Sequence, residues 1–200
     1  GLGSYTATAL ADIVDNSISA GATEVSIDFS WAGQNSRISV LDNGRGMSDA
    51  ELESAMRLGD KNPLVAREAH DLGRFCMGLK TASFSQCRRL TVASWKDGEM
   101  CSWCWDLDVV RDRQDWVLVG LREDQIHSLP HGNDLLAMEH GTLVLWQMLD
   151  RISPDGDALD QALEAKVDEA REHLALVFHR LLTSKRGGAG VYLTINEIAV

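Results

Sequence analysis

The chain has little positive charge for its size. Its 200 residues hold 19 lysines and arginines against 30 aspartates and glutamates, a formal net charge of −11 at pH 7. A domain this acidic is repelled by phosphate backbones, so we expect no direct nucleic-acid binding by this domain alone. No apolar run approaches the ~20 residues of a membrane-spanning helix, and nothing at the start resembles a signal peptide. We therefore expect no membrane association.

Cysteine is also scarce, with four residues in the chain. Cys101 and Cys104 form a C-x-x-C, but no second C-x-x-C and no paired histidines complete a zinc site. The two lie in an alternating stretch that predicts a strand, where residues three apart point to opposite faces. We expect structural, reduced cysteines and a cytoplasmic location, because the cytosol keeps thiols reduced.

An initiator methionine is missing, since the chain begins with Gly1 and Leu2. We expect it to be a piece of a longer protein. Two hundred residues are enough for one domain with a substantial core.

Hydrophobic periodicity predicts an α+β order of elements. A first helix ends at Gly21, and Ser48 with Glu51 forms a capping box that opens a short helix. A polar loop is expected over 59–72, followed by a glycine-bordered, helix-like stretch over 73–87. Strands are predicted over 23–31, 37–42, 89–95, 100–108, 116–121 and 141–149, a long amphipathic helix over 157–183, and a last strand or hairpin over 191–200. The alternation favours a mainly antiparallel sheet with its helices gathered on one face.

The first helix has an unusual polar face. At ~100° per residue its apolar arc holds Leu10, Ile13, Val14, Ser17 and Ile18, and the opposite arc holds Asp12, Asp15, Asn16 and Ser19. Asp12 and Asn16 are one turn apart on the same face, and no basic residue accompanies them. Oxygen acceptors and one amide suit a hard cation or a positioned water. A solvated helix face is the alternative.

The stretch LDNGRGM places a carboxylate at the end of a strand, followed by two glycines. Asp42 could accept a hydrogen bond from an exocyclic amine, while Gly44 and Gly46 allow close approach of a flat ligand and Met47 packs on a ring. An ordinary Asp-Asn-Gly turn is the alternative.

The stretch GRFCMGLK is the third candidate. Gly73 and Gly78 border a tight loop that runs into a helix and turns backbone N–H groups toward an anion, to which Lys80 adds a charge. A glycine pair followed by a lysine is also common without function.

Together these stretches resemble one family. In their order and spacing, ADIVDNSISAGA, LDNGRGM, LGRFCMGLKTAS and HGTLVLW resemble the ATP-binding domain of the GHKL superfamily, which includes DNA gyrase, MutL, the ninety-kilodalton heat-shock chaperone, MORC proteins and histidine kinases. The likeness covers about residues 5–150 and is closest to MutL and MORC-type members. No P-loop motif occurs. The resemblance implies a Bergerat-type fold, a two-layer α/β sandwich whose mixed, mainly antiparallel sheet is covered on one face by helices.

The resemblance also implies roles for the matched positions. Asn16 would coordinate Mg²⁺ at the nucleotide phosphates, with Ser19 and Ala20 beside it. Asp42 would bind the adenine amino group directly and through water, and Thr142 would help to hold that water. The residues that would let the base approach or lie beside it are Gly44, Gly46 and Met47.

A lid over about 57–79 would close on the phosphates. Its contacts would come from Gly73, Arg74, Phe75, Cys76, Met77, Gly78 and Leu79. Lys80 would act near the terminal phosphate. Residues 1–150 would then be the ATP-binding domain, and 151–200 would complete it or lead into a further domain.

Three positions depart from the family pattern. Asp12 stands where hydrolysing members usually have the glutamate that orients the attacking water, and it is one methylene shorter. Ser19 replaces a frequent aspartate. Cys76 replaces the middle glycine of the phosphate loop, which would cost roughly 1–2 kcal/mol if that position needs a positive φ.

The leading hypothesis is a slow Mg²⁺-dependent ATPase, selective for ATP over GTP, whose lid closure drives formation of a homodimer in the full-length protein. A nucleotide-binding module with little or no turnover is the first alternative, because Asp12 is short. A histidine-kinase catalytic domain is the second; against it, these 200 residues hold no helix with a phospho-acceptor histidine ahead of the candidate ATP-binding stretches, and the long predicted helix follows them.

Overall fold

The computed structural model of the chain describes residues 2–57, 79, 82–149 and 156–200. These residues form one sheet with the strand order β5-β4-β3-β6-β2-β1-β7-β8. The strands are β1 (Glu24–Ser30), β2 (Arg37–Asp42), β3 (Arg89–Lys96), β4 (Glu99–Asp106), β5 (Val119–Gly120), β6 (Gly141–Gln147), β7 (Tyr192–Ile195) and β8 (Ile198–Ala199). Neighbouring strands are antiparallel, except for the parallel pair β1 and β7. The predicted mixed, mainly antiparallel sheet is confirmed.

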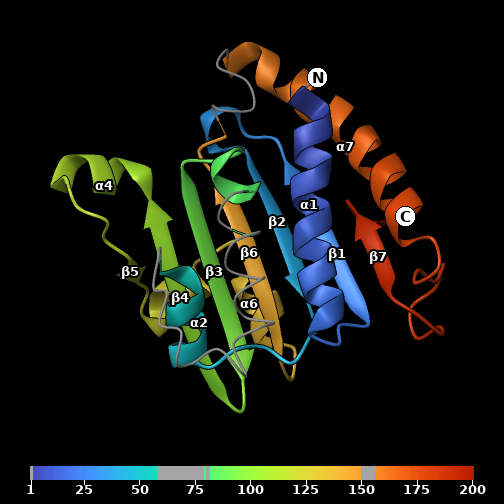
Figure 1. Cartoon of the computed structure of the whole chain (residues 1–200), viewed down its shortest axis with the longest axis horizontal. Coiled ribbons are helices and arrows are strands. Elements are labelled where there is room, and N and C mark those ends of the chain that lie inside the picture. Colours follow the sequence, from blue (N-terminus) through green and yellow to red (C-terminus); the bar gives the residue numbers. More distant parts are fainter. Residues whose placement is uncertain (1, 58–78, 80–81, 150–155) are drawn as a thin grey trace, which may run out of the picture.

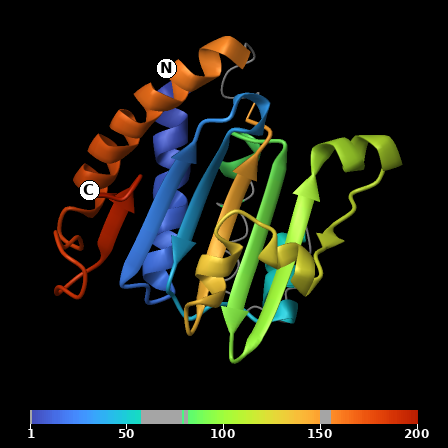
Figure 2. The same ribbon diagram turned by 180° about the vertical axis from the view of Figure 1, so that it is seen from behind.

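The main helical layer covers one face of this sheet (Figure 1). It contains α1 (Leu2–Ser19), α2 (Asp49–Met56) and, packed along α1, α7 (Gly156–Phe178). The short helices α5 (Glu123–His127) and α6 (Gly132–Leu136) lie over the opposite face of the sheet. Figure 2, the view from behind, shows α6 in front of the strands. The connecting helices are η1 (Gly33–Asn35) and α4 (Leu107–Arg113). The predicted layer on one face is confirmed, and α5 with α6 is an addition that periodicity did not predict.

Strand alternation decides which residues face the main helical layer. In the register of β2 with β6, Val40 lies opposite Val144 and Asp42 lies opposite Thr142. Val40 and Val144 belong to the larger hydrophobic core under α1. Because alternate residues of a strand share a face, Asp42 and Thr142 lie side by side on that same face, beyond the last apolar pair.

The first helix buries the arc that its sequence predicts. Leu10, Ile13, Val14 and Ser17 are buried, whereas Asp12 and Asp15 are exposed. The helix stops at Gly21, whose φ is +78°. The N–H of Ala22 donates to the carbonyl of Ser17 at 3.0 Å, and the N–H of Gly21 donates to the carbonyl of Ile18 at 2.9 Å. This is the Schellman pattern, so the predicted glycine stop is confirmed.

The second helix begins at the predicted capping box. The Ser48 side chain accepts from the N–H of Glu51, and the Glu51 carboxylate accepts from the N–H of Ser48 at 2.7 Å. The ammonium group of Lys96 on β3 lies 2.9 Å from the same carboxylate. These partners lower the pKa of Glu51, with the Ser48 N–H as the largest cause. The box therefore holds the start of α2 against the sheet as well as starting the helix.

The end of the chain extends the same sheet. β7 pairs in parallel with β1, and β8 folds back on β7 through Asn196 and Glu197, whose φ values are +48° and +66°. The side-chain oxygen of Asn196 accepts from the N–H of Phe29 at 2.8 Å. The predicted terminal hairpin is confirmed.

The long C-terminal helix is shorter than predicted. It ends at Phe178, and Val177 and Leu181, two apolar residues of the predicted helix, are 48% and 47% exposed. The N–H groups of Leu181 and Leu182 both donate to the Phe178 carbonyl, which closes the last turn. Leu182 then forms a bridge with Val191, so strand pairing ends the helix before residue 183.

The strand predicted over 116–121 is also shorter, because only Val119 and Gly120 pair with β4. Trp116 instead packs edge-on against Trp105, with ring centroids 5.7 Å apart. The residues around Trp116 therefore make an aromatic contact instead of pairing with β4.

The two C-x-x-C cysteines point to opposite faces, as predicted. Cys101 pairs with Ser94 on the side of the main helical layer, whereas Cys104 accepts a 3.4 Å hydrogen bond from Thr91 on the other side. Burial raises the pKa of Cys101 to about 12, which keeps this thiol protonated and unreactive. Among the described residues, no helix is long and apolar enough to cross a membrane.

Candidate functional site

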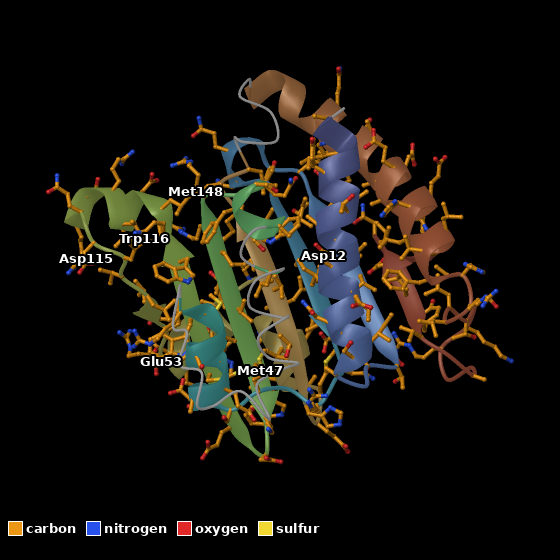
Figure 3. All side chains as sticks on the ribbon, in the orientation of Figure 1. Asp12, Met47, Glu53, Asp115, Trp116 and Met148 are labelled. Carbon is orange, nitrogen blue, oxygen red and sulfur yellow. The ribbon has the colours of Figure 1, made fainter. Side chains whose placement is uncertain are left out.

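The acidic face of α1 carries the first group of candidate residues. Asp12, Asp15 and Ser19 are exposed, and Asn16 and Ala20 are half-buried. Figure 3 shows Asp12 on α1 and Met47 near α2, on the same face of the sheet. Although the Asp12 side chain reaches solvent, desolvation by the neighbouring protein, followed by the nearby charge of Asp15, raises its pKa. A carboxylate with a raised pKa is a stronger base than an ordinary aspartate.

Asp42 is the most deeply buried carboxylate among the candidates, with 5% exposure at the end of β2. Its Oδ2 accepts from the hydroxyl of Ser17 on α1 at 2.7 Å, and its Oδ1 accepts from the N–H of Gly44 at 2.8 Å. Burial raises its pKa, while Ser17, Gly44 and the N–H of Thr142 act in the opposite direction. Asp42 is therefore a buried acceptor held in place from a helix, a loop and a strand.

The glycines after Asp42 are required by contacts inside the protein. A Cβ on Gly44 would lie 2.9 Å from the Cβ of Ala20 and 3.0 Å from Oδ1 of Asp42. Gly46 has a φ of +71°, and a Cβ there would lie 2.2 Å from the Trp95 carbonyl oxygen. From the sequence, these glycines were expected to allow the close approach of a flat ligand. The structure shows a further reason, since they let the loop pack against the end of α1 and against β3.

Replacement of Gly46 by alanine should destabilise the fold. We expect a loss of about 2–4 kcal/mol in the free energy of unfolding, from a left-handed backbone (roughly 1–2) and from displacement of the Trp95 carbonyl (roughly 1–3). Gly98 is a matched control, because its φ is +78° and a Cβ on it would have nothing within 4 Å. Gly98→Ala should lose only about 1–2 kcal/mol. The free energies of unfolding are measured by urea denaturation. An equal loss of stability in the two variants would contradict the proposed clash between an alanine side chain at position 46 and the Trp95 carbonyl.

A second polar group joins Thr142 to the loop after Asp42. Thr142 is 6% exposed, and its Oγ1 lies 3.0 Å from the hydroxyl of Ser94, which is fully buried on β3. The N–H of Met47 donates to Ser94 at 2.8 Å. His140 donates from Nδ1 to the Gly44 carbonyl at 2.5 Å. Asp42, Met47 and Thr142, which are separated in sequence, are thus joined in one network.

Ser17, Ser94 and His140 were missed as site residues by sequence reasoning. Ser17 is a polar residue in the apolar arc of α1, and Ser94 follows Leu90 and Val92 on the inward side of β3. A buried hydroxyl at an apolar position needs a partner, and this is the signal that could have found both. His140 gave no comparable signal.

The phosphate-binding stretch is only partly described. Gly73, Arg74, Phe75, Cys76, Met77, Gly78 and Lys80 lie outside the described residues, as does most of the predicted lid. Leu79 is described, and its side chain is fully buried in the larger hydrophobic core. Its contact with a phosphate would therefore have to come from its backbone.

The described residues contain no group of three histidine, cysteine, aspartate or glutamate side chains that could hold a metal ion. Asn16 offers one amide oxygen next to Ser17, the residue that binds Asp42. Mg²⁺ commonly keeps several waters and takes only one or two protein oxygens together with substrate phosphates. The donor set thus fits a magnesium ion that arrives with a nucleotide.

Comparison with known proteins gives one family. Residues 4–142 match the family described as "Histidine kinase-, DNA gyrase B-, and HSP90-like ATPase". The chain is 32% identical over 91 residues to ATPase morc-1 of Caenorhabditis elegans, which covers 46% of this chain and 10% of that protein. It is 35% identical over 97 residues to the DNA mismatch repair protein MutL of Microcystis aeruginosa, covering 46% of this chain and 17% of that protein. The alignments span less than a fifth of either relative.

Proposed function

The chain belongs to the family of histidine kinase-, DNA gyrase B- and HSP90-like ATPases, and from this premise we propose that it binds Mg²⁺-ATP on the polar side of α1 and hydrolyses it slowly. The family supports ATP binding and an ATPase type of function. The observation that carries the proposal is the buried Asp42 carboxylate, which three internal donors hold beside Thr142.

Asp42 is the proposed adenine contact. A buried carboxylate accepts a hydrogen bond from the exocyclic amine of adenine, whereas the carbonyl oxygen of guanine would face it with no proton between them. Sites built around such a hydrogen bond reject the wrong analogue by roughly 10⁴ or more. Titration calorimetry with a non-hydrolysable ATP analogue and with its GTP counterpart tests the proposal. Saturable binding of the ATP analogue alone is expected, and binding of neither, or of both equally, would refute it.

Asn16 and Asp12 are the proposed phosphate-side residues. Asn16 would hold Mg²⁺, which when bound neutralises charge on the phosphates. Asp12 lies one turn earlier on α1, where its carboxylate would orient a water molecule and take its proton. Lys80 is proposed to contact the terminal phosphate on the basis of the sequence resemblance.

Removal of the Asn16 amide should weaken nucleotide binding only when magnesium is present. We expect Asn16→Ala to lose roughly tenfold or more in ATP affinity with Mg²⁺, because one metal ligand is missing. With EDTA in place of Mg²⁺ the parent and the variant should bind ATP equally, which provides the control. The same loss in both buffers, measured by calorimetry, would assign Asn16 a structural role instead.

We further propose that the segment over about 57–79 closes on ATP and that closure drives homodimer formation in the full-length protein. The sequence resemblance to MutL and MORC-type proteins supports this step. Light scattering of the full-length protein with and without a non-hydrolysable ATP analogue tests it, and a mass that stays monomeric with saturating analogue would contradict it.

The second candidate function is nucleotide binding with little turnover. The exposed, short side chain of Asp12 favours it, because a carboxylate that does not reach the water cannot activate it. Single-turnover phosphate release separates the two functions, since only an ATPase converts the bound nucleotide.

A further inference from the structure

Ser94 is the buried centre of the network at the proposed adenine site. It is fully buried on β3, and its Oγ has three partners. These are the N–H of Met47 at 2.8 Å, the carbonyl oxygen of Gly141 at 3.0 Å and the hydroxyl of Thr142 at 3.0 Å. The partners belong to the loop after β2 and to β6, so one hydroxyl joins three segments of the chain.

The protons in this network can be counted. A serine hydroxyl has one proton to donate and two lone pairs that accept. The N–H of Met47 can only donate, so it occupies one lone pair of Ser94. The carbonyl of Gly141 can only accept, so it takes the single proton of Ser94. The remaining lone pair of Ser94 then has to face the hydroxyl proton of Thr142.

This count determines how Thr142 meets a ligand. With its own proton directed at Ser94, the Thr142 oxygen presents only lone pairs elsewhere. Asp42, its neighbour across the β2–β6 pair, is likewise an acceptor. A ligand or water at this place therefore meets two acceptors and must supply the protons.

We propose that Ser94 is a positioning residue that holds Thr142 as a hydrogen-bond acceptor and thereby directs a bridging water toward N1 of adenine. The inference rests on the proposed ATP-binding function and deepens it. Adenine N1 is an acceptor, so Thr142 in this orientation cannot bind it directly. A water that donates one proton to Thr142 and the other to N1 joins the two acceptors, while the adenine amine donates to Asp42.

Nucleotide analogues give a readout that a merely structural serine would not change. In 1-deaza-ATP a C–H replaces N1, so the acceptor for the bridging water is missing. We expect the parent to bind ATP about tenfold or more tightly than 1-deaza-ATP. Ser94→Ala frees the Thr142 hydroxyl to rotate, so it should lose about tenfold in affinity for ATP and stay within about twofold for 1-deaza-ATP.

Ser102 provides the matched control. It is 3% exposed on the neighbouring strand β4 and donates to the Val92 carbonyl at 3.0 Å. It pairs with Ala93, whose side chain lies in the smaller core on the opposite face of the sheet. Ser102→Ala therefore removes a similar buried hydroxyl and should leave both nucleotide affinities unchanged.

The experiment is calorimetric binding of both nucleotides to the parent, Ser94→Ala, Thr142→Val, the double variant and Ser102→Ala. Because Ser94 acts through Thr142, its effect on ATP affinity should vanish in the Thr142→Val background. Equal losses for ATP and 1-deaza-ATP in Ser94→Ala, or an unchanged ATP affinity, would overturn the inference while the parent still binds ATP. A parent that binds neither nucleotide would instead refute the proposed function, and this inference with it.

Discussion

Asp42→Asn should abolish measurable ATP binding and leave the fold intact. The carboxylate is the proposed acceptor for the adenine amine, and an amide that turns its NH₂ toward another NH₂ offers no hydrogen bond. We expect a loss of at least about 100-fold in ATP affinity, since a site that recognises one polar group strongly rejects the mismatched one. Calorimetry with a non-hydrolysable analogue measures the loss.

The local contacts explain why the variant should fold. The amide oxygen can keep the Gly44 N–H, which needs an acceptor, so the new NH₂ faces Ser17. The Ser17 hydroxyl can then donate to the Ile13 carbonyl, which already lies 3.2 Å away, and accept from the amide. Every buried polar group of this cluster thus retains a partner.

The difference in stability between the parent and Asp42→Asn should also depend on pH in a defined direction. Burial raises the pKa of Asp42, so the folded state holds the carboxyl proton more tightly than the unfolded state does. Stability of the parent therefore falls as pH rises from the unfolded pKa through the folded one. The asparagine variant lacks this penalty and should unfold at an equal or higher temperature at pH 7.

Asp28→Asn is the control for this variant. Asp28 is a half-buried carboxylate on β1 whose pKa is also raised, chiefly by burial. Its neighbours Ile27 and Phe29 are buried in the larger core, so the Asp28 side chain lies on the opposite face of the sheet from Asp42. Its replacement should leave ATP affinity unchanged. ATP affinity retained by Asp42→Asn would remove the adenine assignment.

Asp12→Asn should stop hydrolysis while ATP still binds. An amide cannot take a proton from water, and loss of a general base typically costs about 10²–10⁴-fold in rate. The ATP dissociation constant should stay within about threefold of the parent, because the proposed role of Asp12 is toward water and not toward the nucleotide. Phosphate release and calorimetry measure the two quantities separately.

Asp12→Glu should act in the opposite direction. The extra methylene extends the carboxylate by about 1.5 Å, and misplacement by about 1 Å at such a position costs about 100-fold. We therefore expect faster phosphate release, by roughly tenfold or more. A variant slower than the parent would show that the backbone already compensates for the shorter aspartate.

The pH profile of hydrolysis gives a further test of Asp12. A base must be deprotonated, so the rate should rise as pH passes through its pKa, which desolvation by the neighbouring protein and then Asp15 raise above the ordinary value. Asp15→Asn removes the second cause and should shift this acid limb to lower pH. An acid limb that stays in place would show that another group limits the rate.

Periodicity and end signals predicted most elements because each depends on neighbours in sequence. The buried arc of α1, the stop at Gly21 and the Ser48–Glu51 box follow from local hydrogen bonds and from one helical face. The end of α7 and the length of β5 were predicted wrongly. Both depend on partners nine or eleven positions away along the chain, Val191 for Leu182 and Trp105 for Trp116, which lie beyond the span of a helical turn or of strand alternation.

By itself the sequence determined the α+β fold class and the acidic face of α1, because spacing along helices and strands carries that information, and its resemblance to a known family indicated the candidate role of Asp42. Only the tertiary structure decided which buried hydroxyls hold Asp42 and Thr142 and why Gly44 and Gly46 have no side chain. Those contacts join residues 24 to 49 positions apart, as between Ser17 and Asp42 or Ser94 and Thr142. Hydrogen-bond direction depends on where each donor and acceptor lies in space, and no local pattern encodes that arrangement.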